Sequence, residues 1–389
     1  MHTILQHPLR IALLGTALIF VVNLVFPSQL NGFQPRLNLS PAHVWDSPHA
    51  DESFYWRSAH SVFSRRPVTL FLQKMMFDAG IPFGGSFAII VLSAYFFSGL
   101  LIYRLALFFG TPKAKAGWAA ILFYLCFSNV YAFLGNIFAY DDPLQYFLVL
   151  LSLWLFFRGN KGWSVVFFAI ACLARETSFL LLPFFFLWER KMDKRLIVSL
   201  LMAIGSVGVY VLFLLKTRSP EMWESSRDYL LHDRIYHWAK NFGSFERATE
   251  SVYCLFLVAA LPFWVTWKSL SRQASSHRLI FQYACFVLVV NSALTFFGGL
   301  AREARLFALP LLLIWPVSGD GMAAFVAQIR QNMRAYRRRE WAAMLLVSLL
   351  VSFGLYQPSI GRTGLLFQAY SFVYLVVLGL GLYEPRRRV

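Results

Sequence analysis

The sequence predicts an all-α integral membrane protein with about twelve transmembrane helices. Three observations support this fold class: 58% of the 389 residues are hydrophobic, only 14% are charged, and many apolar runs are about as long as a membrane span. A soluble domain typically has about 25% charged and about 45–50% apolar residues. A soluble fold of this length would leave too much apolar surface in water, so we expect a bilayer to cover it.

The apolar runs define the expected spans, because a transmembrane helix needs about 20 mostly apolar residues. Ten candidates lie near 11–26, 85–109, 117–134, 144–157, 196–216, 251–267, 279–297, 304–317, 341–356 and 366–383. A further apolar stretch, 163–188, is interrupted by Arg175-Glu176. Its halves, 163–174 and 177–188, are either two short spans or a hairpin that is partly re-entrant, and with both counted the total is twelve.

The distribution of charge supports this topology, since Lys and Arg accumulate in cytoplasmic loops. With the N-terminus inside and strict alternation, the inner segments have 21 basic and five acidic residues, and the outer segments have 15 and 14. We therefore expect both termini in the cytoplasm. The net charge of +17 then reflects membrane topology rather than nucleic-acid binding, and the sequence has neither a zinc-ligand spacing nor an RNA-binding signature.

We expect a single transmembrane domain over 1–389, without a soluble C-terminal domain. Two outer loops are long, 27–84 and 217–250. Within the first, Val68–Phe77 resembles an amphipathic helix on the outer interface, and the second is rich in Trp, Tyr and His and also suits interfacial helix. The longest cytoplasmic loop, 318–340, ends in three arginines that suit an anchor near anionic lipid.

The first apolar run and the positions of the cysteines also favour an integral membrane protein. The first run, Ile11–Phe26, is not followed by a small-x-small cleavage site, so we interpret it as an uncleaved span rather than a signal peptide. The four cysteines each lie inside an apolar run, which is typical of small buried side chains rather than a disulfide framework. They are Cys126, Cys172, Cys254 and Cys285.

Four groups of charged residues lie on the expected outer face. The first is Asp51-Glu52, followed by Tyr55 and by Arg65-Arg66-Pro67. A carboxylate there suits a base that takes a proton from a hydroxyl, and the alternative is a solvated turn or helix cap. The second is Asp141-Asp142-Pro143, where a metal or substrate contact is one interpretation and an N-cap by Asp142 is the other.

The remaining two groups contain arginines. Arg175-Glu176 interrupts the short hairpin, and Gly298-Gly299 leads through Arg302, Glu303 and Arg305 into the tenth span. An arginine beside glycines offers a guanidinium and backbone N–H groups, and both suit a phosphate. The alternative is pairing between Arg and Glu that holds the helices together. These two interpretations are compatible.

Together these residues resemble the GT-C superfamily of polytopic glycosyltransferases. The resemblance rests on Asp51-Glu52-x-x-Tyr55 in a long first outer loop, then Arg66-Pro67 and a surface helix. It is greatest for the branch that includes lipid A aminoarabinose transferase and protein O-mannosyltransferases. The Arg175-Glu176 hairpin and the segment 301–305 before Leu309-Pro310 are also similar to bacterial members. The chain departs from the family in having Arg65-Arg66-Pro67-Val68 where a Lys-Pro-Pro motif is common, and in its expected lack of a soluble C-terminal domain.

The resemblance implies an inverting transfer of a sugar from a polyprenyl-phosphate donor to a hydroxyl or phosphate acceptor on a glycan, lipid or protein. Asp51 would be the general base, and Glu52 would orient the acceptor or an arginine. The expected substrate-binding residues are Tyr55, Arg66, Asp141, Asp142, Arg175, Glu176, Arg302, Glu303 and Arg305. A divalent metal such as Mg²⁺ or Mn²⁺ is used in part of the superfamily, and Asp141 would be its ligand.

Two other classes of function stay open. A flippase or transporter for a lipid-linked saccharide usually shows internal repeats and charges near mid-membrane, whereas here the charges gather at the outer ends. An O-antigen-type polymerase would use outer-face arginines and a long outer loop in the later part of the chain. The loop 217–250 fits that description. We expect the protein to lie in a bacterial inner membrane, with the active site facing the periplasm. We expect membrane lipids among its partners, and no nucleic acid.

Overall fold

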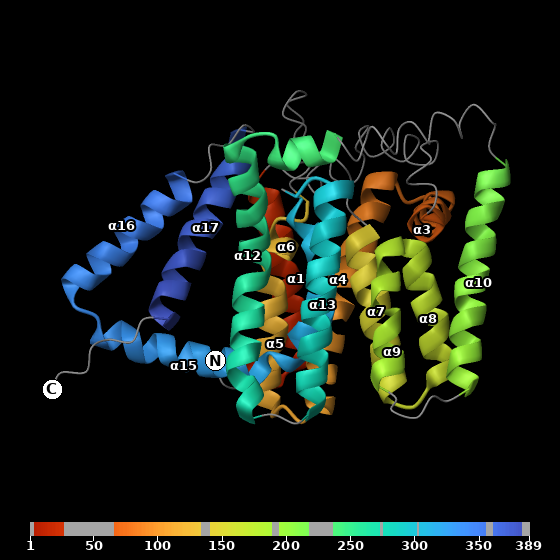
Figure 1. Cartoon of the computed structure of the whole chain (residues 1–389), viewed down its shortest axis with the longest axis horizontal. Helices are drawn as coiled ribbons and strands as arrows, with labels where there is room; N and C mark the ends of the chain where they lie inside the picture. The colour runs from red at the N-terminus through yellow and green to blue at the C-terminus, as the bar shows by residue number, and fades with distance from the viewer. Residues whose placement is uncertain are drawn as a thin grey trace.

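The computed structural model describes residues 4–26, 66–133, 141–188, 194–217, 236–272, 275–301, 303–354 and 361–382. Every regular element within these ranges is helical. Among the described residues, five helices are long and apolar enough to cross a membrane: α1 (Pro8–Val25), α4 (Phe83–Phe108), α10 (Lys194–Thr217), α12 (Phe245–Ser269) and α13 (Ser275–Gly298). Most helices run side by side (Figure 1). The chain is an integral membrane protein.

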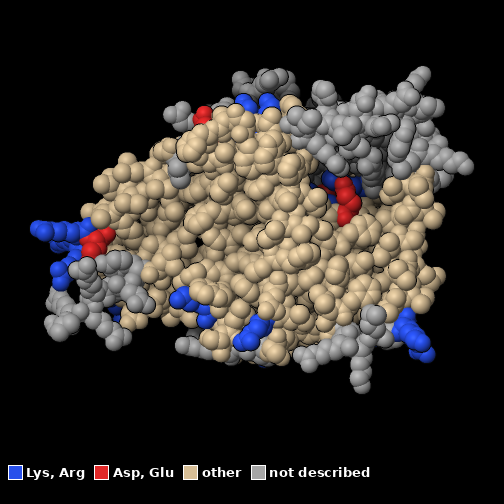
Figure 2. All heavy atoms as spheres, viewed as in Figure 1, with Lys and Arg blue, Asp and Glu red and all other residues tan. Residues whose placement is uncertain are grey.

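The long helices differ in how much protein surrounds them. In the most apolar part of α4, 61% of the residues are buried, whereas in α10 only 17% are. Because α10 is just as apolar, its exposed side chains suit contact with lipid tails. Figure 2 shows a broad band with few charged atoms, bordered above and below by Lys, Arg, Asp and Glu. This is the surface that a bilayer requires.

Further helices complete the bundle. They are α5 (Lys113–Leu125), α6 (Phe127–Val130), α7 (Asp141–Phe157), α8 (Lys161–Ala174), η5 (Glu176–Leu181), α9 (Leu182–Trp188), α16 (Arg338–Gly354) and α17 (Gly361–Leu382), with the short η1 (Ile4–Gln6) and η6 (Leu270–Arg272). The expected hairpin over 163–188 is present as α8, followed by η5 and α9. Its turn contains Arg175 and Glu176, and α8 packs along α7.

The expected outer surface helix is α3 (Pro67–Asp78), drawn nearly end-on at the upper right of Figure 1. Pro67 is its first residue, where the missing N–H costs nothing. Exposed Phe71, Met75 and Phe77 suit a helix that lies in a membrane interface. Residues 236–242 of the second expected outer loop are helical as well.

Two segments in the second half of the chain differ in local structure from what their sequence suggested. The segment 318–340 was expected to be a loop, but Gly319–Ala335 forms helix α15, which lies across the lower end of the bundle in Figure 1. Met322 and Phe325 are buried on one side of α15, and its arginines lie on the other side. This separation of apolar and charged residues is that of an amphipathic helix. The expected continuous span 304–317 is broken into η7 (Ala304–Phe307), α14 (Leu311–Ile314) and η8 (Trp315–Val317), because Pro310 and Pro316 remove N–H donors.

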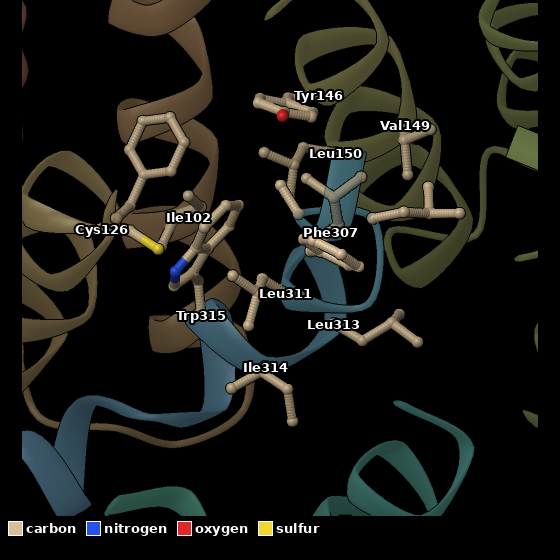
Figure 3. Packing of buried hydrophobic residues seen from close by; sticks show 14 of the residues in the cluster. Ile102, Cys126, Tyr146, Val149, Leu150, Phe307, Leu311, Leu313, Ile314 and Trp315 are labelled. Carbon is tan, nitrogen blue, oxygen red and sulfur yellow. The ribbon is translucent and has the colours of Figure 1, made fainter. Parts of the chain in front are cut away.

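The broken segment 304–317 lies at the centre of the core. Trp315 is fully buried, with its ring centroid 4.9 Å from that of Phe123 and 6.3 Å from that of Tyr146. Figure 3 shows Trp315 beside Ile102 and Cys126, with Leu311 next to it. Side chains from α4, α5, α7 and the broken segment therefore pack against one another. This packing supports the polar residues at the start of α7 and in η7.

Glycines allow α1, α4 and α5 to approach closely. A Cβ atom on Gly15 or on Gly99 would lie 2.2 Å or 2.0 Å from atoms of Tyr124. The Tyr124 hydroxyl donates to the Tyr95 carbonyl oxygen at 3.0 Å. Small residues at helix interfaces are typical of membrane bundles, where association depends on close packing.

Candidate functional site

Arg66 ties the surface helix α3 to two other parts of the chain. Its Nε and Nη2 donate to the two carboxylate oxygens of Glu176 at 2.8 and 2.9 Å, and its Nη1 donates to Asp141 Oδ2 at 3.2 Å. All three nitrogens are therefore used. Burial alone would lower the pKa of Arg66, but the carboxylates of Glu176 and Asp141 outweigh it and raise that pKa above its ordinary value. Arg66 stays charged.

Asp141 begins helix α7 and is nearly fully buried. Its Oδ1 accepts a hydrogen bond from Thr69 Oγ1 at 2.7 Å, while Oδ2 accepts from Arg66. Thr69 is itself buried on the inner side of α3. The surface helix thus reaches α7 through a threonine and an arginine that are one helical turn apart.

Asp142 is shared by two buried arginines. Its Oδ1 accepts from Arg175 Nη1, and its Oδ2 accepts from Arg305 Nε at 3.1 Å. Arg305 Nη2 also donates to Glu303 Oε2 at 2.6 Å. The N-cap interpretation of Asp142 was wrong, because α7 already begins at Asp141 and the Asp142 carboxylate is directed to the arginines. The hairpin turn, α7 and η7 therefore meet at one carboxylate.

The turn of the hairpin is also held by neutral groups. Gln145, one turn into α7, donates from Nε2 to Thr177 Oγ1 at 3.0 Å and to Ser178 Oγ at 2.8 Å. Ser178 Oγ in turn donates to the Ala171 carbonyl oxygen at 3.1 Å. These bonds fix the position of Arg175 and Glu176 relative to α7.

Asn241 holds the segment that leads to Glu303 and Arg305. Its Nδ2 donates to the carbonyl oxygens of Phe296 and Gly299 at 2.9 and 2.8 Å, and its Oδ1 accepts from Ala301 N–H at 3.0 Å. From the core side, Tyr146 OH donates to the Arg305 carbonyl oxygen at 3.1 Å. The arginine segment is therefore positioned from both sides.

The structure brings together residues that the sequence places in separate motifs. Two groups of ion pairs lie next to each other, because Asp141 adjoins Asp142 and Arg175 adjoins Glu176 in the chain. The first group is Arg66 with Asp141 and Glu176, and the second is Asp142 with Arg175 and Arg305, the latter also paired with Glu303. We call the two groups together the charged cluster. Asp51, Glu52, Tyr55 and Arg302 lie outside the described residues. Thr69, Gln145, Tyr146 and Asn241 were not predicted, since a lone polar residue in or near an apolar run has no distinctive sequence signal.

The charged cluster contains one more carboxylate than guanidinium groups. Three guanidinium groups face four carboxylates, and most of these side chains are shielded from solvent, whereas Glu176 is 52% exposed. Charged groups at the edge of a membrane bundle are costly and usually mark a functional site. Arg175 uses a single nitrogen for its ion pair, so its geometry suits a second anion better than that of Arg66.

The described residues do not suit a divalent metal. No group of three His, Cys, Asp or Glu side chains with metal-binding geometry occurs among them. The oxygens of Asp141 accept from Arg66 and Thr69, and those of Asp142 accept from Arg175 and Arg305. A cation at either carboxylate would meet a guanidinium of the same charge.

Comparison of the chain with models of protein families, with curated proteins and with solved structures found no match.

Proposed function

We propose that the protein is a GT-C-type glycosyltransferase that moves a sugar from a polyprenyl-phosphate donor to a hydroxyl or phosphate acceptor at the outer face of the membrane. The observation that carries this proposal is the charged cluster, in which arginines and carboxylates from α3, α7, the hairpin turn and η7 meet at the end of a membrane bundle. A substrate with a phosphate on a lipid needs charged contacts at this depth.

The proposal includes a twelve-span arrangement. The spans are α1, α4, α5 with α6, α7, α8, η5 with α9, α10, α12, α13, the broken segment 304–317, α16 and α17. The start of α1 and the end of α17 both lie toward the lower end of the bundle in Figure 1, as an even number of crossings requires. The basic residues along the lower border make that end cytoplasmic by the positive-inside rule, and the charged cluster then faces the periplasm of a bacterial inner membrane.

The chemistry is an inverting displacement. The acceptor oxygen forms a bond to the anomeric carbon while the bond from that carbon to the phosphate oxygen breaks. The proton of the acceptor passes to the Asp51 carboxylate, and polyprenyl phosphate leaves with the bonding electrons. Arg302 and Arg175 stabilise the leaving phosphate, with Arg305 close by. Glu52 orients the acceptor, and Tyr55 contacts the substrate.

The contacts divide the other cluster residues between holding the site and meeting the substrate. Arg66 is saturated by Glu176 and Asp141, so it secures α3, the helix that directly follows the segment with Asp51 and Glu52. Asp142 and Glu303 hold Arg175 and Arg305 in place. This is a preorganised anion site, in which the arginines need not reorient when charge develops.

The test is transfer of labelled sugar from polyprenyl-phosphate donors by the purified full chain, with Asp51→Asn as the variant. Asp78→Asn is the matched control, since Asp78 is an exposed carboxylate on α3 that pairs with Lys74. Activity that is lost in Asp51→Asn and kept in Asp78→Asn supports the transferase and its base. Full activity in Asp51→Asn removes that base. Binding of lipid-linked saccharide without transfer from any donor indicates a flippase or polymerase instead.

A further inference from the structure

A cavity of about 710 Å³ lies at the lower end of the bundle, opposite the charged cluster. It is lined by the end of α12, by α15, by the end of α17 and by Lys115 at the start of α5. Its apolar walls include Trp264, Val265, Phe325 and Leu382. Its volume is within the range of about 300–1,000 Å³ that is usual for small-molecule sites.

Tight packing holds α15 in place beside the cavity. A Cβ atom on Gly321 would lie 2.0 Å from the Val265 carbonyl oxygen, and one on Gly381 would lie 1.7 Å from the Phe325 ring. Asn332 Nδ2 also donates to the Leu380 carbonyl oxygen at 2.6 Å. Three of the helices that line the cavity are therefore fixed to one another.

The polar side of the cavity carries positive charge. Lys115 Nζ forms an ion pair with Asp320 at 2.7 Å, so this pair is neutral. Lys268 also lines the cavity, is exposed, and has no carboxylate partner among the described residues. Along α15, Arg330 and Arg334 line a second hollow. Lys268 and the exposed Arg334 thus contribute positive charge at this end of the bundle.

Two tryptophans place the cavity at the level of lipid headgroups. Trp267 is 58% exposed at the end of α12, and tryptophans are enriched at membrane–water interfaces. The Lys268 ammonium lies 5.9 Å from the ring centroid of Trp264 and 5.8 Å from that of Trp267. Because a cation already occupies these positions, a choline headgroup would bring a second cation to the same rings.

We propose that this cavity binds the headgroup of an anionic phospholipid from the membrane leaflet at the lower end of the bundle. The phosphate and its glycerol meet Lys268, and the acyl chains run along the apolar surface of α12 beside Trp267. Basic pockets between membrane helices are suited to anionic headgroups. This site is separate from the charged cluster and does not depend on the proposed transferase activity.

The experiment is native mass spectrometry of the delipidated full chain with added phosphatidylglycerol or phosphatidylcholine. We expect phosphatidylglycerol to bind more tightly, and Lys268→Ala to weaken its binding about fivefold, which corresponds to about 1 kcal/mol per basic residue near a membrane surface. Lys268→Arg should retain binding. Lys240→Ala is the matched control, because Lys240 also lies over an aromatic ring, that of Tyr236 at 5.1 Å, but at the other end of the bundle.

A second variant tests the cavity itself. Ala324→Trp fills it from α15, where Ala324 is exposed and lines the cavity, and it should reduce phosphatidylglycerol binding while the thermal unfolding midpoint stays near that of the wild type. Equal binding of the two lipids, or equal losses in Lys268→Ala and Lys240→Ala, would overturn the proposal. Inorganic phosphate that displaces the lipid at low millimolar concentration would also overturn it, since that indicates a site for a soluble anion.

Discussion

At the scale of single residues, the charged cluster depends on carboxylates that each serve two partners. Asp142 accepts from Arg175 and Arg305, and Asp141 accepts from Arg66 and Thr69. Removing one partner from a buried ion pair leaves an uncompensated charge, which is more costly than never having formed the pair. These residues should therefore be sensitive even to isosteric changes.

Asp142→Asn should destabilise the protein strongly. The amide has the same shape, but Arg175 loses its carboxylate and Arg305 keeps only Glu303. We expect the free energy of unfolding in detergent to fall by about 3–5 kcal/mol. Asp78→Asn, which breaks an exposed pair within α3, should cost no more than about 0.5 kcal/mol. Equal effects of the two variants in thermal unfolding would contradict the importance of the buried network.

Arg66 and Glu176 should be coupled energetically. They form a two-point ion pair between α3 and the hairpin turn, although Glu176 is half-exposed and water screens part of the attraction. A double-mutant cycle with Arg66→Ala and Glu176→Ala should give a coupling of about 0.5–1.5 kcal/mol. The cycle of Lys74→Ala and Asp78→Ala is the control and should give less than about 0.5 kcal/mol. A coupling near zero for the first pair would show that Glu176 does not help to hold α3 in place.

At the scale of elements, short helices and turns bring the site residues together. The hairpin α8–η5–α9 carries Arg175 and Glu176 to α7, and helix 236–242 holds the segment before η7 through Asn241. The long helices could be predicted from their apolar runs, because a span is a local property of about 20 residues. The breaks in 304–317 follow from Pro310 and Pro316, which remove N–H donors. The burial of Met322 and Phe325 on α15 depends on the surrounding core.

Asn241→Ala should loosen the segment between α13 and η7. The variant removes three hydrogen bonds to residues 296–301, and each is worth about 0.5–1.5 kcal/mol. We expect faster amide hydrogen exchange in 299–306 than in the wild type, with little change in α4. Gln328→Ala, which removes one side-chain bond within α15, should leave 299–306 unchanged. Uniform loss of protection over the whole chain would instead indicate general destabilisation.

At the scale of the whole molecule, the two ends of the bundle differ in chemistry. The upper end contains the charged cluster and α3, and the lower end contains α15 with its arginines. A membrane protein with this asymmetry should insert in one orientation, because basic residues are retained on the cytoplasmic side.

The orientation can be measured with single cysteines in a chain whose four native cysteines are replaced by alanine. Lys240→Cys and Arg334→Cys lie at exposed positions at opposite ends of the bundle. In intact cells, a membrane-impermeant thiol reagent should label the variant at 240, and it should label the variant at 334 only after the membrane is permeabilised. The reverse pattern would place the charged cluster in the cytoplasm and rule out a periplasmic active site.

By itself, the sequence determined the membrane class, the long apolar helices, the surface helix α3 and the break in the apolar stretch 163–188 at Arg175-Glu176, because hydrophobicity and helical period are local properties. It also identified seven charged residues that form two neighbouring groups of ion pairs. Only the tertiary structure decided that Asp142 pairs with Arg175 and Arg305, residues 33 and 163 positions away in the chain. Such contacts depend on how the helices pack, since side chains distant in sequence meet only when the whole bundle encloses them.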